Sequence, residues 1–146
     1  MSFLADIRKA LRDQLAADTD VKAMFGTNVL EDCTPDPSNC DCIVIRKYRV
    51  KEMREEFGKG YETTLVFELV VDAIMIKQHQ ADGDAAQLKA DQVIREAIEN
   101  DTTLGCKVAY ATPTYTQWGI ETNRHERYHT QVNVEITAYV NPTNRG

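Results

Sequence analysis

The chain has 146 residues, of which 42% are hydrophobic and 27% are charged, and its net charge at neutral pH is −6. These values are typical of one globular domain, expected here over residues 1–146 with a flexible tail at 141–146, and they exclude a disordered or collagen-like chain. The acidic balance argues against binding duplex nucleic acid over the whole surface. No apolar run approaches the roughly 20 residues that span a membrane, and the N-terminus lacks the charged-then-apolar pattern of a signal peptide.

The first predicted element is a helix over residues 3–15, because apolar side chains recur there at intervals of three and four and share one stripe. A second, short helical turn follows and ends at Gly26. Residues 28–39 are expected to form a loop, since Pro35 and Pro37 cannot donate backbone hydrogen bonds to a sheet.

Two strands are predicted next, over residues 42–50 and 61–76. The second strand is apolar on both of its faces, which requires cover on both faces. Helices of this chain can cover one face, so we expect the other to lie at or near a contact with a neighbouring subunit, unless the chain's own loops cover it. The candidate contact residues are Val66, Val70 and Ile74.

A charged segment, residues 51–60, joins these two strands and is expected to form a long hairpin tip or arm. Strict alternation places two cations of the preceding strand, Lys47 and Arg49, on the same face as Ile43. The glutamates between the cations favour a protein partner of mixed charge over a DNA backbone, and a solvated tip without a partner is the alternative. The candidate partner-contact residues are Lys47, Arg49, Lys51 and Arg54.

The C-terminal half is predicted to contain a second helix over residues 85–98, an extended segment over 108–118 and a cleanly alternating strand over 128–140. Pro113 marks a bend or an edge position in the extended segment. The expected order is therefore α-β-β-α-β-β. We predict an α+β domain with a mostly antiparallel four-stranded sheet and two helices packed on one face.

Residues 125–129 spell H-E-x-x-H, the string with which helical zinc peptidases bind their metal. The string opens a segment of period two, and in an extended chain His125 and His129 are about 13 Å apart, too far to share one ion. We therefore expect no metal site here and keep a zinc metallopeptidase only as a remote alternative.

No other catalytic arrangement stands out: the chain lacks a Gly-x-Ser-x-Gly elbow and a phosphate-binding loop. We accordingly expect no enzyme, no catalytic residues and no cofactor. The four cysteines are predicted to be free thiols, with a metal site or a disulfide as alternatives. These residues are Cys33, Cys40, Cys42 and Cys106.

The layout of the elements resembles that of the tail terminator (tail completion) proteins of long-tailed bacteriophages. An N-terminal helix is followed by the turn Val21–Gly26, a proline-containing loop and the strand start Cys42–Ile45. A long apolar strand over 65–76 then precedes the helix over 85–98, and the chain closes on Tyr115–Trp118 and the alternating strand.

This resemblance implies a structural virion protein that forms a ring, commonly of six copies, on the head-proximal end of the tail tube. Such a ring stops tube polymerisation and offers a surface to the head connector, while DNA passes through its centre only as cargo. The implied location is the tail–head junction of the virion, after assembly in the host cytoplasm. Another head–tail joining (neck or head-completion) protein and a small non-viral adaptor module are the alternatives.

Overall fold

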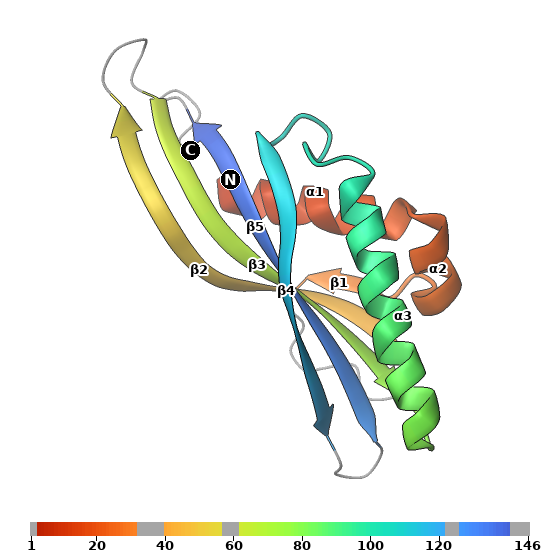
Figure 1. The fold of residues 1–146 in the computed structure, drawn as a ribbon. Coiled ribbons are helices and arrows are strands. Elements are labelled where there is room, and N and C mark those ends of the chain that lie inside the picture. The colour runs from red at the N-terminus through yellow and green to blue at the C-terminus, as the bar shows by residue number, and fades with distance from the viewer. Residues whose placement is uncertain (1–2, 32–39, 57–61, 122–125, 141–146) are drawn as a thin grey trace.

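The computed structural model describes residues 3–31, 40–56, 62–121 and 126–140. Within these residues, helices and strands alternate along a chain that builds one central sheet (Figure 1). The helices are α1 (Phe3–Ala17), α2 (Thr19–Phe25) and α3 (Gln80–Glu99). The strands are β1 (Val29–Glu31), β2 (Cys42–Glu56), β3 (Glu62–Ile76), β4 (Tyr110–Glu121) and β5 (Arg127–Val140).

The strands form a five-stranded sheet in the spatial order β1-β2-β3-β5-β4. Strand β1 pairs with β2 in parallel, with Val29 opposite Ile43. The other three pairings are antiparallel, so the long strands β2, β3, β5 and β4 alternate in direction across the sheet. Strand β4 lies at the edge, which is a position where the missing N–H of Pro113 is tolerated.

The predicted mostly antiparallel four-stranded sheet with two helices is wrong, because the described residues form a mixed five-stranded sheet and three helices. The missed strand, β1, has only three residues, too few to show a period. It pairs because Val29 is 1% exposed in the core and its carbonyl accepts a hydrogen bond from Arg12 Nε. The third helix, α2, is predicted only as a short helical turn that ends at Gly26 and is not one of the two predicted helices; it is capped by the Asp18 carboxylate, which accepts from two backbone N–H groups.

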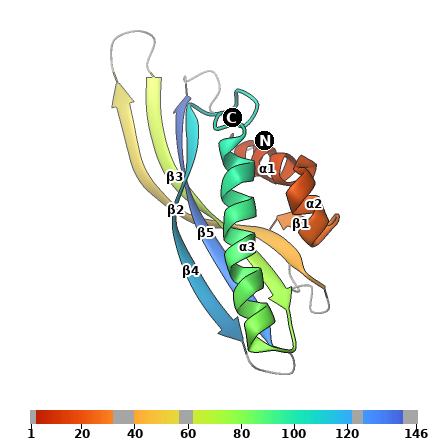
Figure 2. The same cartoon turned by 45° about the vertical axis from the view of Figure 1, so that its right-hand side comes forward.

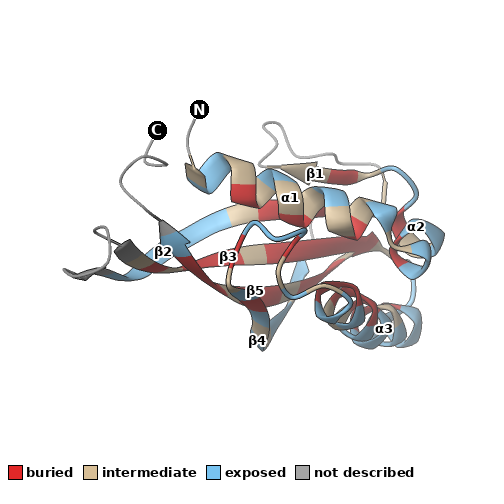
Figure 3. Cartoon of the chain, turned by 90° about the horizontal axis from the view of Figure 1, so that it is seen from above, coloured by how far each residue is buried: buried red, intermediate tan, exposed pale blue. Residues whose placement is uncertain are grey.

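One face of the sheet is covered by the helices, which lie together on one side of the strands (Figure 2). Apolar side chains of α1, α2 and α3 share a single buried cluster with inward-facing side chains of all five strands. Seen from above, buried segments run along the middle of the strands and along the sheet-facing sides of the helices (Figure 3). The opposite face, which we call the open face, carries Glu68, Val70, Asp72, His129 and Asn133, among others, and no described helix packs on it.

Most long elements agree with the sequence-based expectation, including the first helix, the strand that ends at Ile76 and the final strand. Helix α3 begins at Gln80, five residues before the predicted start. Strand β2 continues through Glu56 into the segment predicted as a charged arm, whereas residues 57–61 and the predicted tail lie outside the described residues.

Candidate interaction surfaces

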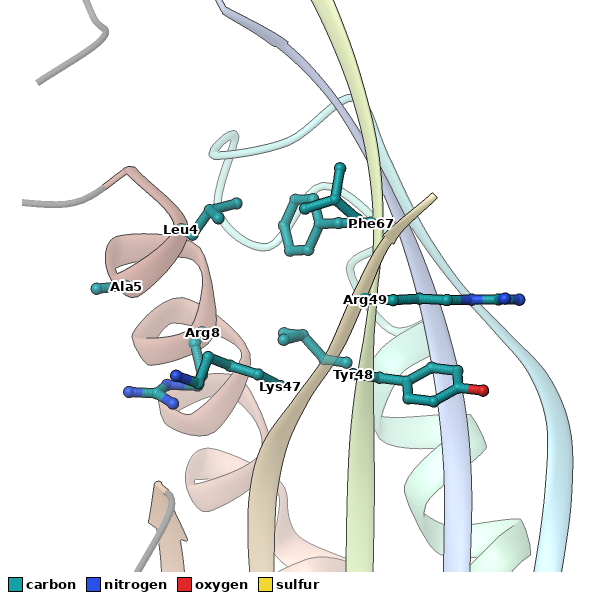
Figure 4. Close-up of a pocket in the computed structure, with 9 residues that line it drawn as sticks. Leu4, Ala5, Arg8, Lys47, Tyr48, Arg49 and Phe67 are labelled. Atoms are coloured by element: carbon teal, nitrogen blue, oxygen red, sulfur yellow. The ribbon is translucent and has the colours of Figure 1, made fainter. Parts of the chain in front are cut away.

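Two β-bulges in β2 decide which of its side chains reach the open face. The register shifts between Lys47 and Arg49 and again between Val50 and Glu52. As a result Arg49 lies opposite Glu68, and its side chain points to the same side as Tyr48, away from Lys47 (Figure 4). Strict alternation, which places Arg49 on the side of Ile43, fails here because each bulge inserts one residue without a partner.

The bulges place the predicted partner-contact cations on different faces of the sheet. Arg49 Nε lies 2.6 Å from Glu68 Oε1, and Lys51 Nζ reaches across β3 to lie 2.8 Å from Glu135 Oε2. Each carboxylate raises the pKa of the cation that it contacts, chiefly through the hydrogen bond. Lys47 is exposed on the helix side, and the side chain of Arg54 lies outside the described part of the chain.

The predicted subunit-contact residues all lie on the open face, where they differ in exposure. Val66 and Val70 are half-buried, opposite Thr137 and Asn133 of β5. Ile74 is only 1% exposed and forms a small buried cluster with Cys42 and Val44. Of these three residues, only the two valines therefore offer apolar surface to another molecule.

A row of charged side chains crosses the open face and links all four long strands. Arg46 of β2 contacts Asp72 of β3, with 3.4 Å between Nε and Oδ2. His129 of β5 lies between two carboxylates: its Nδ1 is 2.9 Å from Asp72 Oδ1, and its Nε2 is 2.6 Å from Glu121 Oε1 of β4. We call this row, Arg46–Asp72–His129–Glu121, the transverse rung. Sequence reasoning missed it, although an aspartate in an otherwise apolar strand was a signal.

The rung also accounts for the described part of the H-E-x-x-H string. His129 is in a strand, as the period of two predicts, and His125 lies outside the described residues. The carboxylates of Asp72 and Glu121 contact opposite nitrogens of the imidazole, so the three groups do not converge on one point. Across the described residues, no group of three or more His, Cys, Asp or Glu side chains could hold a metal ion. Among the described residues, Cys40, Cys42 and Cys106 form no disulfide, and Cys33 is outside the described ranges.

Aromatic side chains from the two outer long strands meet over the open face. Burial and the nearby hydroxyl of Tyr48 raise the pKa of Tyr115, and Asn133 Nδ2 donates to the Tyr115 hydroxyl over 3.2 Å. The guanidinium of Arg49 lies 5.1 Å from the centre of the Tyr48 ring. Both tyrosines remain about half exposed, at 51% and 45%. This bridge over the sheet gives the open face an aromatic surface beside Val70.

The sheet presents two free edges of opposite character. No described strand pairs with the outer edge of β4, which carries no charged residue from Tyr110 to Ile120 and exposes Trp118 and Ile120 at 49% each. Among described residues, β1 pairs only with residues 43–45 of β2, so the outer edge of residues 46–56 is also unpaired. This second edge is rich in charge and is interrupted by both bulges.

A groove of about 420 Å³ lies beside the second edge, between α1 and β2 (Figure 4). Leu4, Val50 and Phe67 contribute apolar surface to it. Arg8 and Lys47 lie at one end, where Arg8 Nε is 3.9 Å from Glu31 Oε1. The groove therefore combines an apolar floor with a cationic rim.

None of the described helices combines the length and the apolar character needed to cross a membrane. A comparison with protein-family models gives no match, and a comparison with curated protein sequences gives none either. A chain in the solved virion of a native gene transfer agent (GTA) particle has a similar fold, with a TM-score of 0.50 and 13% sequence identity. The alignment covers 90% of this chain and 95% of that chain. At this identity the likeness shows a shared fold.

Proposed function

We propose that this chain is a structural protein of a phage-like virion and that it acts as a tail terminator. In this role a ring of identical copies, six by resemblance, caps the head-proximal end of a tail tube and ends its polymerisation. The fold shared with a chain of the gene transfer agent virion supports the virion role. The order of the elements, which resembles that of phage tail terminators, supports the finer assignment.

The observation that carries the proposal is the pair of unequal free edges. Proteins that stay monomeric protect their edge strands with charge, proline or bulges, and the β2 edge has charge and bulges. The β4 edge has Pro113 and a register shift between Pro113 and Thr116, but from Thr116 to Ile120 it carries no charge, no proline and no further shift. A chain with an uncharged edge at β4 and a charged edge at β2 is suited to a heterologous contact, in which one edge of each copy binds the other edge of the next copy.

The strand directions are compatible with such a contact. Three successive antiparallel pairings separate β2 from β4, so these two strands run in opposite directions. A neighbouring copy in the same orientation would therefore add its β2 antiparallel to β4, as a continuation of the sheet. Repetition of this contact closes a ring when a whole number of equal rotations between neighbouring copies makes one full turn.

The proposed partners are other copies of the chain, the tail tube protein and the head connector or neck protein. The chain would act by binding alone, without catalytic residues or a cofactor, and DNA would pass through the ring as cargo. Assembly would take place in the host cytoplasm, and the finished ring would lie at the tail–head junction. A neck or head-completion protein is the second candidate, because a ring at either position needs the same subunit contact.

Native mass spectrometry of the purified chain tests the ring. We expect a closed multiple of the 16.5 kDa chain, and a single-chain mass for the double variant Trp118→Lys/Ile120→Lys, because two lysines oppose strand pairing at the β4 edge. The exposed Ala23→Lys in α2 is the control and should keep the ring. Circular dichroism confirms folding of each variant. A wild-type chain that stays monomeric at every concentration would contradict the proposal.

Incubation with separately purified tail tube protein or head connector distinguishes the two candidates. A terminator should shorten growing tubes and bind to their ends, as seen by electron microscopy. A neck protein should bind the connector and leave tube length unchanged.

A further inference from the structure

The imidazole of His129 is held between two carboxylates from different strands. It is 8% exposed, and its Nδ1 contacts Asp72 of β3 while its Nε2 contacts Glu121, the last residue of β4. The Nε2 contact with Glu121 is short, at 2.6 Å, but it is not an aligned hydrogen bond, so it becomes an ion pair when the imidazole is protonated. The side chain of Glu121 is 47% exposed, so it can move away into water.

A neutral imidazole carries one N–H and one lone pair. In either neutral tautomer of His129, one of the two carboxylates would face a lone pair at close range. Only the imidazolium places a positive charge between both carboxylates. We propose that protonated His129 is a pH-dependent latch that ties the end of the edge strand β4 across the sheet to β3. This latch is independent of the proposed ring.

The charged surroundings determine the direction of the pH dependence. The hydrogen bond to Asp72 raises the pKa of His129 above its ordinary value of 6.5, burial opposes this effect, and Glu121 adds to it. Two further cations face the carboxylates rather than the imidazole: Arg46 contacts Asp72, and Arg127 Nη1 is 3.8 Å from Glu121. A raised folded pKa means that the stabilisation is complete below about pH 6.5 and is lost as the pH rises through the folded pKa.

The consequence is local because of where Glu121 lies. It ends the strand whose outer edge is free, and the described chain pairs this end of β4 only with the start of β5. Loss of the imidazolium would remove the link from Glu121 to β3. The last residues of β4, from Gly119 to Glu121, would then open more often. The latch therefore controls how often the end of β4, which the molecule exposes to partners, opens.

An NMR titration of the His129 ring tests the first part of the proposal. We expect a midpoint above pH 6.5 in the wild-type protein and a downward shift in Glu121→Gln, which removes one carboxylate. Glu99→Gln, an equal charge change at the exposed end of α3, is the control and should leave the midpoint unchanged. A wild-type midpoint at or below 6.5, or equal midpoints in the two variants, would overturn the latch.

Hydrogen exchange of the amides at residues 119–121 tests the second part. After correction for the intrinsic pH dependence of exchange, wild-type protection should fall as the pH passes the His129 midpoint. Glu121→Gln should show low protection already below that midpoint. Protection that stays constant across the titration would overturn the latch, whatever the oligomeric state of the protein.

Discussion

At the scale of single residues, Gly83 of α3 packs directly against the ring of Tyr128 in β5. A Cβ at this position would overlap the ring of Tyr128, which is 1% exposed and therefore has no room to move. The hydroxyl of Tyr128 donates to Glu126 over 2.7 Å, which holds the ring in place. Glycine is thus required here by contact with β5 and not by its backbone angles.

We predict that Gly83→Ala destabilises the protein by about 1–3 kcal/mol, because the overlap outweighs the roughly 1 kcal/mol that alanine gains in a helix. Urea unfolding measures the effect. Gly119→Ala is the matched control, since its new Cβ would meet only His129 Cβ at an ordinary 3.6 Å. Equal stability of Gly83→Ala and the wild-type protein would show that the Tyr128 ring is mobile.

At the scale of elements, Gln14 of α1 joins the two long helices. Its Nε2 lies within hydrogen-bond distance of two carbonyl oxygens in the last turn of α3, Ala97 at 2.9 Å and Ile98 at 3.3 Å, and of the carbonyl of Asp101 just after the helix, at 3.0 Å. The last carbonyls of a helix have no partner inside it. A side chain from a distant part of the chain therefore satisfies the C-terminal end of α3 and fixes its position against α1.

Replacement of Gln14 by alanine should cost about 1–2 kcal/mol, because part-buried carbonyls lose their donor. Thermal unfolding measures the loss, and hydrogen exchange should increase in the last turn of α3. Gln92→Ala is the control, because this exposed glutamine donates only to Glu96 within the same helix. Similar losses in the two variants would mean that the contact between α1 and α3 contributes little.

At the scale of the whole molecule, the two faces of the sheet are unequal. The helix face is sealed by a single apolar core, whereas the open face combines half-buried valines, an aromatic bridge and paired charges. Most of the open-face cations already pair within the chain. A partner on this face would therefore be held by Val66, Val70 and the tyrosines more than by unpaired charge.

If the open face contributes to the proposed subunit contact, Val70→Asp should yield a folded protein with the mass of one chain, because the new carboxylate stays hydrated only when the contact is absent. Light scattering measures the mass, and circular dichroism measures folding. Val70→Thr, of similar shape, should remain assembled. An unfolded Val70→Asp would place Val70 in the core of the chain itself, and an assembled one would place the contact elsewhere.

The sequence by itself determined the long helices and strands in which one side-chain spacing repeats many times. The stripe of Ile7, Leu11 and Leu15 predicts α1, and the alternation from Tyr128 onward predicts β5, because one repeated side-chain spacing sets each element. The placement of Val66 and Val70 on the sheet face opposite the helices also follows from such alternation.

Only the tertiary structure decided the rest, because it depends on contacts between residues far apart in the chain. Strand β1 exists through its pairing with β2, and Arg49 reaches the open face through a bulge that appears only in the register with β3. The transverse rung joins side chains from four strands, with Asp72 and His129 separated by 57 positions. No local period encodes such a meeting, since strand order and register bring its members together.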